Sequence, residues 1–183
     1  ISQRYFIRKR KITVIPNWIN TNIFKPNKKI KDKVGILFVG RFENVKNPKL
    51  LLKSMHGINE KVTMVGNGSL KEKLKILAKK YSVELEIIDS LPNIELVSYY
   101  QKCKLYVHTS FYEGNPKTIL EAMACGCCVI AKDVTGVREL INNNNGVLIK
   151  KDSELNSAIK KMLSNTEKRK IISNNARKYI TSN

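Results

Sequence analysis

Short apolar runs alternate with amphipathic helical patterns along almost the whole chain, and this alternation restricts the fold more than any other feature. Runs that are apolar nearly throughout are typical of strands covered on both faces. A repeated strand–helix order at these lengths predicts an α/β fold with an open, doubly wound parallel sheet. The predicted strands are 12–15, 35–39, 62–65, 85–88, 105–108, 128–131 and 147–149, and the predicted helices are 48–55, 70–81, 94–102, 116–124, 137–141, 154–163 and 167–180.

The length of the chain, 183 residues, fits one domain with a sizeable core. Its 42% hydrophobic and 27% charged fractions are those of an ordinary globular protein. No apolar run approaches the roughly 20 residues that cross a bilayer, and the N-terminus lacks the apolar stretch of a signal peptide. We therefore expect a cytoplasmic protein. Because the chain begins abruptly and without methionine, we expect residues 1–183 to be one domain of a longer protein.

The net charge of +19, from 34 Lys and Arg against 15 Asp and Glu, indicates an anionic partner. The candidates are a nucleoside diphosphate, an acidic lipid surface and nucleic acid. Nucleic-acid binding requires basic residues interleaved with aromatic ones. The chain is only 7% aromatic and has no such run, so no nucleic-acid partner is expected. The lysines are spread along the chain, so a solvated surface without a partner is the competing interpretation.

Four cysteines, three of them within four positions, do not form two matched C-x-x-C pairs, so a zinc site is not predicted. The neighbours of Cys125, Cys127 and Cys128 are apolar. Buried, reduced thiols explain these residues and Cys103 best.

Two glycine-containing segments follow predicted strands, and ligands of such sheets bind at the carboxyl ends of the strands. In the first segment, Gly40 allows a tight turn, Arg41 offers a planar fork to a phosphate, and Lys46 adds a point charge. Two cations at a strand end suit a pyrophosphate, although a pair of ordinary surface cations is the alternative. In the second segment, Gly66 and Gly68 predict a tight turn with close approach of the backbone to a ligand.

The segment after the strand at 105–108 contains the strongest pattern. A loop holds Glu113, and a helix is predicted to start at Pro116, a residue suited to a first helical position. The free amides of Lys117 and Thr118 and the helix dipole can hold an anion. Glu121 lies among apolar residues and is therefore expected at the edge of a buried surface, where an acid needs a reason. Two carboxylates beside a phosphate site are best placed to accept hydrogen bonds from sugar and ribose hydroxyls. The preceding His108 is expected to pack or hydrogen-bond rather than act as a general base.

Glu113 and Glu121, separated by seven residues and followed by Ala-Met-Ala-Cys-Gly, resemble the E-x7-E signature of group 1 retaining glycosyltransferases of the GT-B fold. Further similar elements occur in the expected order. They are Val14-Ile15-Pro16-Asn17 with Phe24-Lys25-Pro26, then Val39-Gly40-Arg41 with Lys46, then Gly66-Asn67-Gly68, and finally Gly136-Val137-Arg138-Glu139-Leu140. The resemblance implies a Rossmann-like domain that forms the C-terminal, nucleotide-sugar-binding half of a two-domain enzyme.

By this resemblance, Arg41 and Lys46 stabilise the diphosphate leaving group, Glu113 contacts the donor sugar and Glu121 binds the ribose. The implied reaction transfers a hexose, with retention, to a hydroxyl of a glycan or lipid-linked acceptor, as in polysaccharide biosynthesis. No metal or cofactor is expected beyond the nucleotide sugar, because cations and a helix N-terminus supply the charge. The remaining implied donor-binding residues are Gly40, Gly66, Gly68, Gly114, Asn115, Lys117 and Thr118.

The resemblance also implies an N-terminal acceptor domain outside this chain, so we expect negligible sugar transfer by the chain alone. The basic surface predicts loose attachment to the anionic inner face of a membrane. Two alternatives stay open at this point. One is half of a GT-B-like sugar-nucleotide epimerase, and the other is a basic module that binds nucleic acid or an anionic surface.

Overall fold

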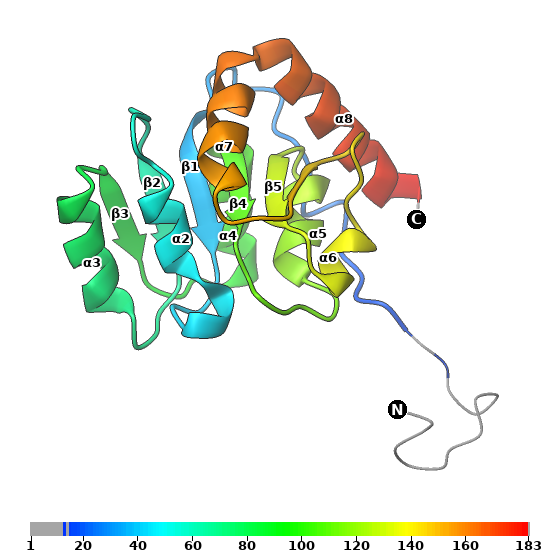
Figure 1. The fold of residues 1–183 in the computed structure, drawn as a ribbon. Coiled ribbons are helices and arrows are strands. Elements are labelled where there is room, and N and C mark those ends of the chain that lie inside the picture. The colour runs from blue at the N-terminus through cyan, green and yellow to red at the C-terminus, as the bar shows by residue number, and fades with distance from the viewer. Residues whose placement is uncertain (1–12, 14, 183) are drawn as a thin grey trace.

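The computed structural model describes residue 13 and residues 15–182 of the chain (Figure 1). The predicted strand at 12–15 therefore falls partly outside the described residues. Its two described members, at positions 13 and 15, lie in no strand.

Six parallel strands form one sheet in the order β3-β2-β1-β4-β5-β6 (Figure 1). The order reverses between β1 and β4, as expected for a doubly wound sheet, so the carboxyl ends of these two strands flank the point where ligands of such sheets bind. The strands are β1 (Val34–Val39), β2 (Val62–Val65), β3 (Leu85–Ile88), β4 (Cys103–His108), β5 (Cys128–Lys132) and β6 (Val147–Ile149).

Helices cover both faces of the sheet, and strand side chains alternate between the two. In β1, Leu37 and Val39 join the core beneath α4, α5 and α8, whereas Ile36 and Phe38 join the core beneath α2, α3 and α7. The helices are α2 (Pro48–Lys53), α3 (Lys71–Lys80), α4 (Asn93–Lys102), α5 (Lys117–Ala124), α6 (Thr135–Arg138), α7 (Glu154–Ser164) and α8 (Thr166–Ser182), with a 3-10 turn, η2, at Asn44–Lys46.

The α/β, doubly wound prediction is confirmed, and most element bounds differ from prediction by one or two residues. The prediction for α5 was wrong by one position, because Pro116 has extended backbone (ψ 108°) and precedes the first helical residue. The predicted helix at 137–141 begins two residues earlier and ends at Arg138, after the extended residue Val134. The cysteine prediction is also confirmed, because all four thiols are free and buried. Among the described residues, no helix combines the length and the apolar character needed to cross a membrane.

Arg177 of α8 joins the turn at residues 21–24 to the end of α5. Its guanidinium donates to the carbonyl oxygens of Phe24 (2.8 Å), Ala124 (2.9 Å) and Thr21 (3.1 Å). Because Ala124 is the last residue of α5, the cation also lies at the negative end of that helix dipole.

Arg177→Met is expected to lower the free energy of unfolding by about 2–4 kcal/mol, because it leaves part-buried carbonyls without a donor. Urea denaturation measures this effect. The matched control is Lys178→Met, on the exposed side of the same helix, for which a change within about 0.5 kcal/mol is expected. Equal denaturation midpoints for the two variants would contradict a structural role for Arg177.

Candidate functional site

The loops that follow β1 and β2 are in direct contact at the carboxyl edge of the sheet. Phe42 N–H donates to Asn67 O (2.8 Å), and Leu70 N–H donates to Phe42 O (2.9 Å). A side chain at Gly66 would place its Cβ 2.1 Å from the carbonyl oxygen of Gly40, and one at Gly68 would lie 2.7 Å from that of Phe42. The close approach that requires these glycines is therefore between the two loops, and the predicted approach to a ligand stays a prediction.

A carboxylate reinforces the same contact. Glu43 accepts hydrogen bonds from the backbone N–H (3.0 Å) and the hydroxyl (2.9 Å) of Ser69. The backbone donor and then the hydroxyl lower the pKa of Glu43. Ser69 therefore joins two loops, and its side chain does not cap α3.

The loop after β4 fixes the position of Lys46. The buried Thr109 hydroxyl lies 2.9 Å from the carbonyl oxygens of both Lys46 and Asn47. Phe111 N–H donates to Val45 O (2.9 Å). These contacts hold η2 against the end of β4, so the segment that carries Lys46 lies beside the segment that carries Glu113.

Glu113 is the centre of a polar network. Its Oε1 lies 2.5 Å from Lys46 Nζ and 3.0 Å from His108 Nε2. His108 Nδ1 lies 3.2 Å from the hydroxyl of Tyr106, which also hydrogen-bonds the side chain of Thr118 in the first turn of α5. The network thus extends from the loop after β1, across the end of β4, to the start of α5.

The pKa values define the protonation of this network. Burial raises the pKa of Glu113, but hydrogen bonds from His108, Lys46 and Ser110 outweigh burial and lower it to about 2. Burial lowers the pKa of His108 despite the neighbouring carboxylate. At neutral pH, His108 is therefore neutral, its Nε2–H donates to the Glu113 carboxylate, and its Nδ1 accepts from Tyr106. The prediction that His108 has a hydrogen-bonding role is confirmed.

Glu121 lies in α5 with only 3% of its surface exposed. Its Oε2 accepts a hydrogen bond from the buried hydroxyl of Tyr100 (2.9 Å). Burial raises the pKa of Glu121, and the Tyr100 hydrogen bond opposes this shift. Glu121 is thus buried more deeply than the expected edge of a buried surface, and Tyr100 is its only side-chain hydrogen-bond partner among the described residues.

The start of α5 presents unpaired polar groups. The first hydrogen bonds within the helix run from Ile119 and Leu120 to Pro116 O, so in the described structure the amides of Lys117 and Thr118 have no carbonyl partner within α5. The side-chain oxygen of Asn115 is buried and lacks a hydrogen-bond partner among residues 13 and 15–182. Gly114, just before it, is exposed.

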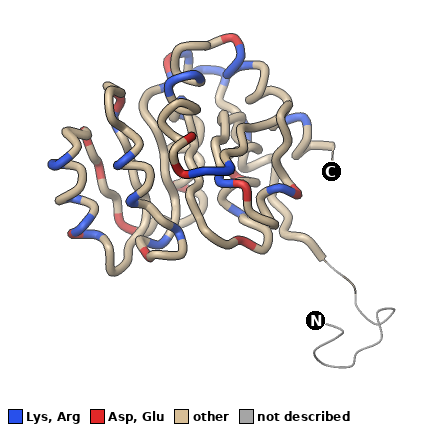
Figure 2. Tube along the Cα trace, viewed as in Figure 1, with Lys and Arg blue, Asp and Glu red and all other residues tan. Residues whose placement is uncertain are grey.

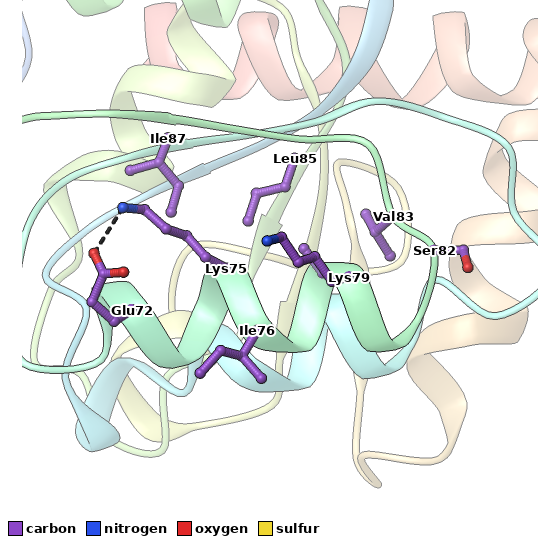
Figure 3. A pocket seen from close by; sticks show the side chains of 9 residues that line it. Glu72, Lys75, Ile76, Lys79, Ser82, Val83, Leu85 and Ile87 are labelled. Carbon is purple, nitrogen blue, oxygen red and sulfur yellow. Dashed lines mark hydrogen bonds and ion pairs between the residues drawn. The ribbon is translucent and has the colours of Figure 1, made fainter.

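A cavity of about 210 Å³ opens at the ends of β1, β2 and β3. It is lined by Gly40, Arg41 and Gly66 together with Ser90 and Leu91. It brings together three of the predicted site residues, whereas Lys46, Glu113 and Glu121 are not in its lining. A further cavity of about 560 Å³ lies between α3 and β3, where Lys75 contacts Glu72 (Figure 3). Val83, Leu85 and Ile87 also line it, and it contains none of the predicted site residues.

Gly136 packs against the backbone of the loop that carries Glu113. Its N–H donates to Glu113 O (3.2 Å), and an added Cβ would come within 2.7 Å of that oxygen and would collide with Gly114 O. Gly136→Ala is therefore expected to displace the loop and to lower the free energy of unfolding by about 2 kcal/mol or more. Chemical denaturation measures the loss. Gly114→Ala is the control, because its Cβ meets nothing within 4 Å. If both variants are equally stable, Gly136 does not support the loop.

Several residues of this site had no sequence signal. Tyr100 and Tyr106 occupy positions that periodicity assigns to the core, and nothing in the sequence marks their hydroxyls as partners of Glu121 and His108. Thr109 and Ser69 are likewise ordinary loop residues in the sequence. In the part of the chain that the structure describes, no three His, Cys, Asp or Glu side chains gather in a way that could hold a metal ion.

This Rossmann-like domain, with its polar network at the carboxyl edge, has the architecture of one half of a GT-B glycosyltransferase. Residues 19–179 match the family model "Glycosyl transferases group 1", and the chain belongs to this family.

Among curated relatives, the chain is 32% identical over 158 residues to the N-acetylgalactosamine-N,N'-diacetylbacillosaminyl-diphospho-undecaprenol 4-alpha-N-acetylgalactosaminyltransferase of Campylobacter jejuni, covering 81% of this chain and 42% of the relative. It is 26% identical over 182 residues to a second N-acetyl-D-galactosaminyltransferase of the same organism, covering 94% of this chain and 50% of that protein. The chain thus spans half or less of these relatives.

Solved structures share the fold. Anabaena HepE in complex with UDP superposes with a TM-score of 0.86 at 20% identity, covering 98% of this chain and 55% of that one. The C-terminal domain of the group 1 protein LpcC from Francisella tularensis superposes with a TM-score of 0.77 at 23% identity, covering 90% of this chain and 97% of that one. At these identities the likeness shows the fold alone.

Proposed function

We propose that residues 1–183 form the C-terminal donor-binding domain of a retaining glycosyltransferase, which transfers a hexose from a nucleoside diphosphate sugar to an acceptor hydroxyl. The observation that carries the proposal is the network in which Lys46 and His108 hold an ionised Glu113 beside the open start of α5. Cations, free amides and carboxylates then meet at the edge where the strand order reverses.

The diphosphate is proposed to bind between Arg41, Lys46 and the first amides of α5. As the bond to the sugar breaks, negative charge grows on the leaving phosphate. Lys46 and the amides stabilise this charge without reorganising, because the Thr109 and Glu113 contacts and the helix already hold them in place. The contacts of Thr109 keep Lys46 on the side of the network that faces Glu113. This charge stabilisation comes from groups of the chain itself.

The two carboxylates are proposed to bind hydroxyls. Glu121 has one oxygen committed to Tyr100, which leaves acceptor capacity for the ribose. Glu113 accepts from hydroxyls of the donor sugar. The unpaired side-chain oxygen of Asn115 needs a donor, and a sugar hydroxyl supplies one.

The base is proposed to occupy the cavity at the ends of β1, β2 and β3. Leu91 and Leu96 supply an apolar surface there, and the backbone around Ser90 supplies polar groups. UDP is the first candidate, because HepE of Anabaena and TarM of Staphylococcus aureus have been solved in complexes that contain UDP.

The acceptor is proposed to bind to a second domain that faces the carboxyl edge. The chain covers 42% and 50% of the two Campylobacter relatives, whose names specify diphospho-undecaprenol substrates. A lipid-linked acceptor is accordingly our first choice, and loose attachment to an anionic membrane stays a prediction. Sedimentation with phosphatidylglycerol vesicles at low salt tests this attachment, and a chain that stays in the supernatant would contradict it.

Calorimetric titration of the chain with UDP, GDP and ADP tests the proposed donor site. We expect one nucleotide to bind in the micromolar to millimolar range and Arg41→Ala and Glu121→Ala each to weaken it at least about 10-fold. Lys53→Ala and Glu84→Ala remove the same charges from exposed positions and should leave binding unchanged. Failure of all three nucleotides to bind to the folded chain would count against a self-sufficient donor site. Epimerisation of the nucleotide sugar in the absence of an acceptor, by the enzyme that contains this chain, would favour the epimerase alternative.

A further inference from the structure

A second polar groove lies at the edge of the sheet opposite the proposed donor site. It has a volume of about 530 Å³ and lies between segment 26–33 and α8, with Lys104 and Gly126 at its base. Lys104 is the second residue of β4, and Gly126 precedes β5, so the groove opens at the amino ends of these strands. The six residues of β4 separate it from the donor edge by roughly 20 Å.

Cations dominate the walls of this amino-edge groove, and Asp32 is the one carboxylate in its lining. Figure 2 shows Lys and Arg positions on both segment 26–33 and the start of α8, which form the two walls. Two lysines have acidic partners outside the groove, because Lys104 pairs with Glu60 and Lys170 pairs with Glu167. Cations still exceed carboxylates when these acids are counted. The six cationic residues are Lys31, Lys33, Lys104, Arg169, Lys170 and Arg177.

The two arginines are held rigidly. Arg169 donates to the carbonyl oxygens of Met162 and Leu163 at the end of α7 and to the Thr166 hydroxyl. Arg177 donates to three carbonyl oxygens, as described above. A guanidinium has five N–H donors, so each arginine retains donors for a ligand. Because carbonyl dipoles hold these cations without cancelling their charge, the groove is preorganised for an anion.

The α8 wall adds neutral donors between the charges. Arg169, Ser173 and Arg177 follow one another at four-residue spacing and therefore share one face of the helix. Asn174 lies beside them and also lines the groove. Alternating cations, hydroxyl and amide in a concave site match the several acceptor oxygens of a phosphate group. The concave shape also concentrates the positive potential.

We propose that the amino-edge groove binds a phosphate-bearing small molecule, such as a diphosphate or a phosphate monoester, at a site separate from the donor site. A lipid headgroup offers the same phosphate chemistry. The concave shape favours a free ligand, because a planar bilayer reaches only the rim of a hollow. This inference does not depend on the proposed glycosyltransferase reaction.

Titration with inorganic pyrophosphate tests the proposal, in an Arg41→Ala/Lys46→Met background that disables the donor edge. Calorimetry measures affinity, and NMR of backbone amides locates the site. We expect pyrophosphate to shift the amides of Ser173 and Asn174. Ser173→Glu, which places a carboxylate among the cations on a helix, is expected to weaken binding at least about 10-fold, and Lys170→Gln about 3-fold or more. Lys178→Gln removes the same charge from the same helix outside the groove, and less than about a 2-fold change is expected.

Two results would overturn the proposal. One is a pyrophosphate affinity that Ser173→Glu leaves unchanged while thermal unfolding shows the variant to be folded. The other is a shift of the groove amides on addition of phosphatidylglycerol vesicles, with no shift on addition of pyrophosphate. The groove would then bind a lipid surface. Loss of nucleotide binding in the background variant, with pyrophosphate still bound in the groove, would separate this site from the donor site.

Discussion

Replacing Lys46 with methionine is expected to lower sugar transfer at least about 100-fold in the proposed two-domain enzyme. The variant removes a fixed cation from the proposed leaving group, and losses of this size follow removal of one preorganised charge-stabilising donor. It also removes the 2.5 Å partner of Glu113, so the carboxylate that is proposed to face the donor sugar is no longer held by the β1 loop. Steady-state kinetics with the nucleotide sugar that calorimetry identifies would measure the effect.

Lys53→Met is the matched control for this experiment. It removes the same charge from the exposed surface of α2, and transfer should stay within about 2-fold of the parent enzyme. A loss confined to KM, with kcat unchanged, would mean that Lys46 binds the donor equally in the ground state and the transition state. Unchanged kcat/KM would remove Lys46 from the proposed mechanism.

Acid should destabilise the domain through Glu113. The folded pKa of this carboxyl is about 2, below the ordinary value of 4.5, so its stabilising contribution is complete above about pH 4.5 and is lost as the pH falls toward 2. The full contribution is about 3 kcal/mol, on a side chain that is 11% exposed. Glu121 acts in the opposite sense, because burial raises its pKa and its contribution is lost as the pH rises.

Glu113→Gln isolates this effect. The difference in unfolding free energy between the parent chain and the variant should shrink by about 2 kcal/mol between pH 5.5 and pH 3, because the parent loses its ionised carboxylate and the variant has none to lose. Urea denaturation at several pH values measures the difference. Glu84→Gln, at an exposed position, should follow the parent curve. A difference that is constant with pH would show that the Lys46 and His108 contacts do not stabilise the ionised form.

The fold could be predicted almost completely because the sheet is buried on both faces. Strands such as Val62–Val65 and Cys128–Lys132 are then apolar nearly throughout, and the helices between them carry apolar residues at helical spacing. Helix ends were less predictable, because they depend on individual backbone angles. Pro116 fits either the position before a helix or its first residue, and only its extended ψ angle decides between them.

The candidate site was only partly predictable, for a different physical reason. Strand ends indicate where ligands bind, so Arg41, Lys46 and Glu113 could be named as candidates from their positions and Glu121 from its apolar neighbours. Their roles came from the family resemblance. Their partners come from other elements, because hydrogen bonds such as that between Tyr100 and Glu121 join residues 21 positions apart. The role of Gly66 and Gly68 in the contact between two loops could not be predicted from the sequence either. It depends on how closely two neighbouring strands bring their loops together.

Three of the four buried cysteines also make the chain a reporter of its own opening. Burial raises the pKa of Cys128 to about 12 and places the pKa values of Cys103 and Cys125 well above their ordinary range, so these thiols are protonated as well as hidden. A thiol reagent requires an accessible thiolate. Labelling of these three thiols at neutral pH therefore reports how often the helices on either face separate from the sheet, and each reacted cysteine is a record of an opening event.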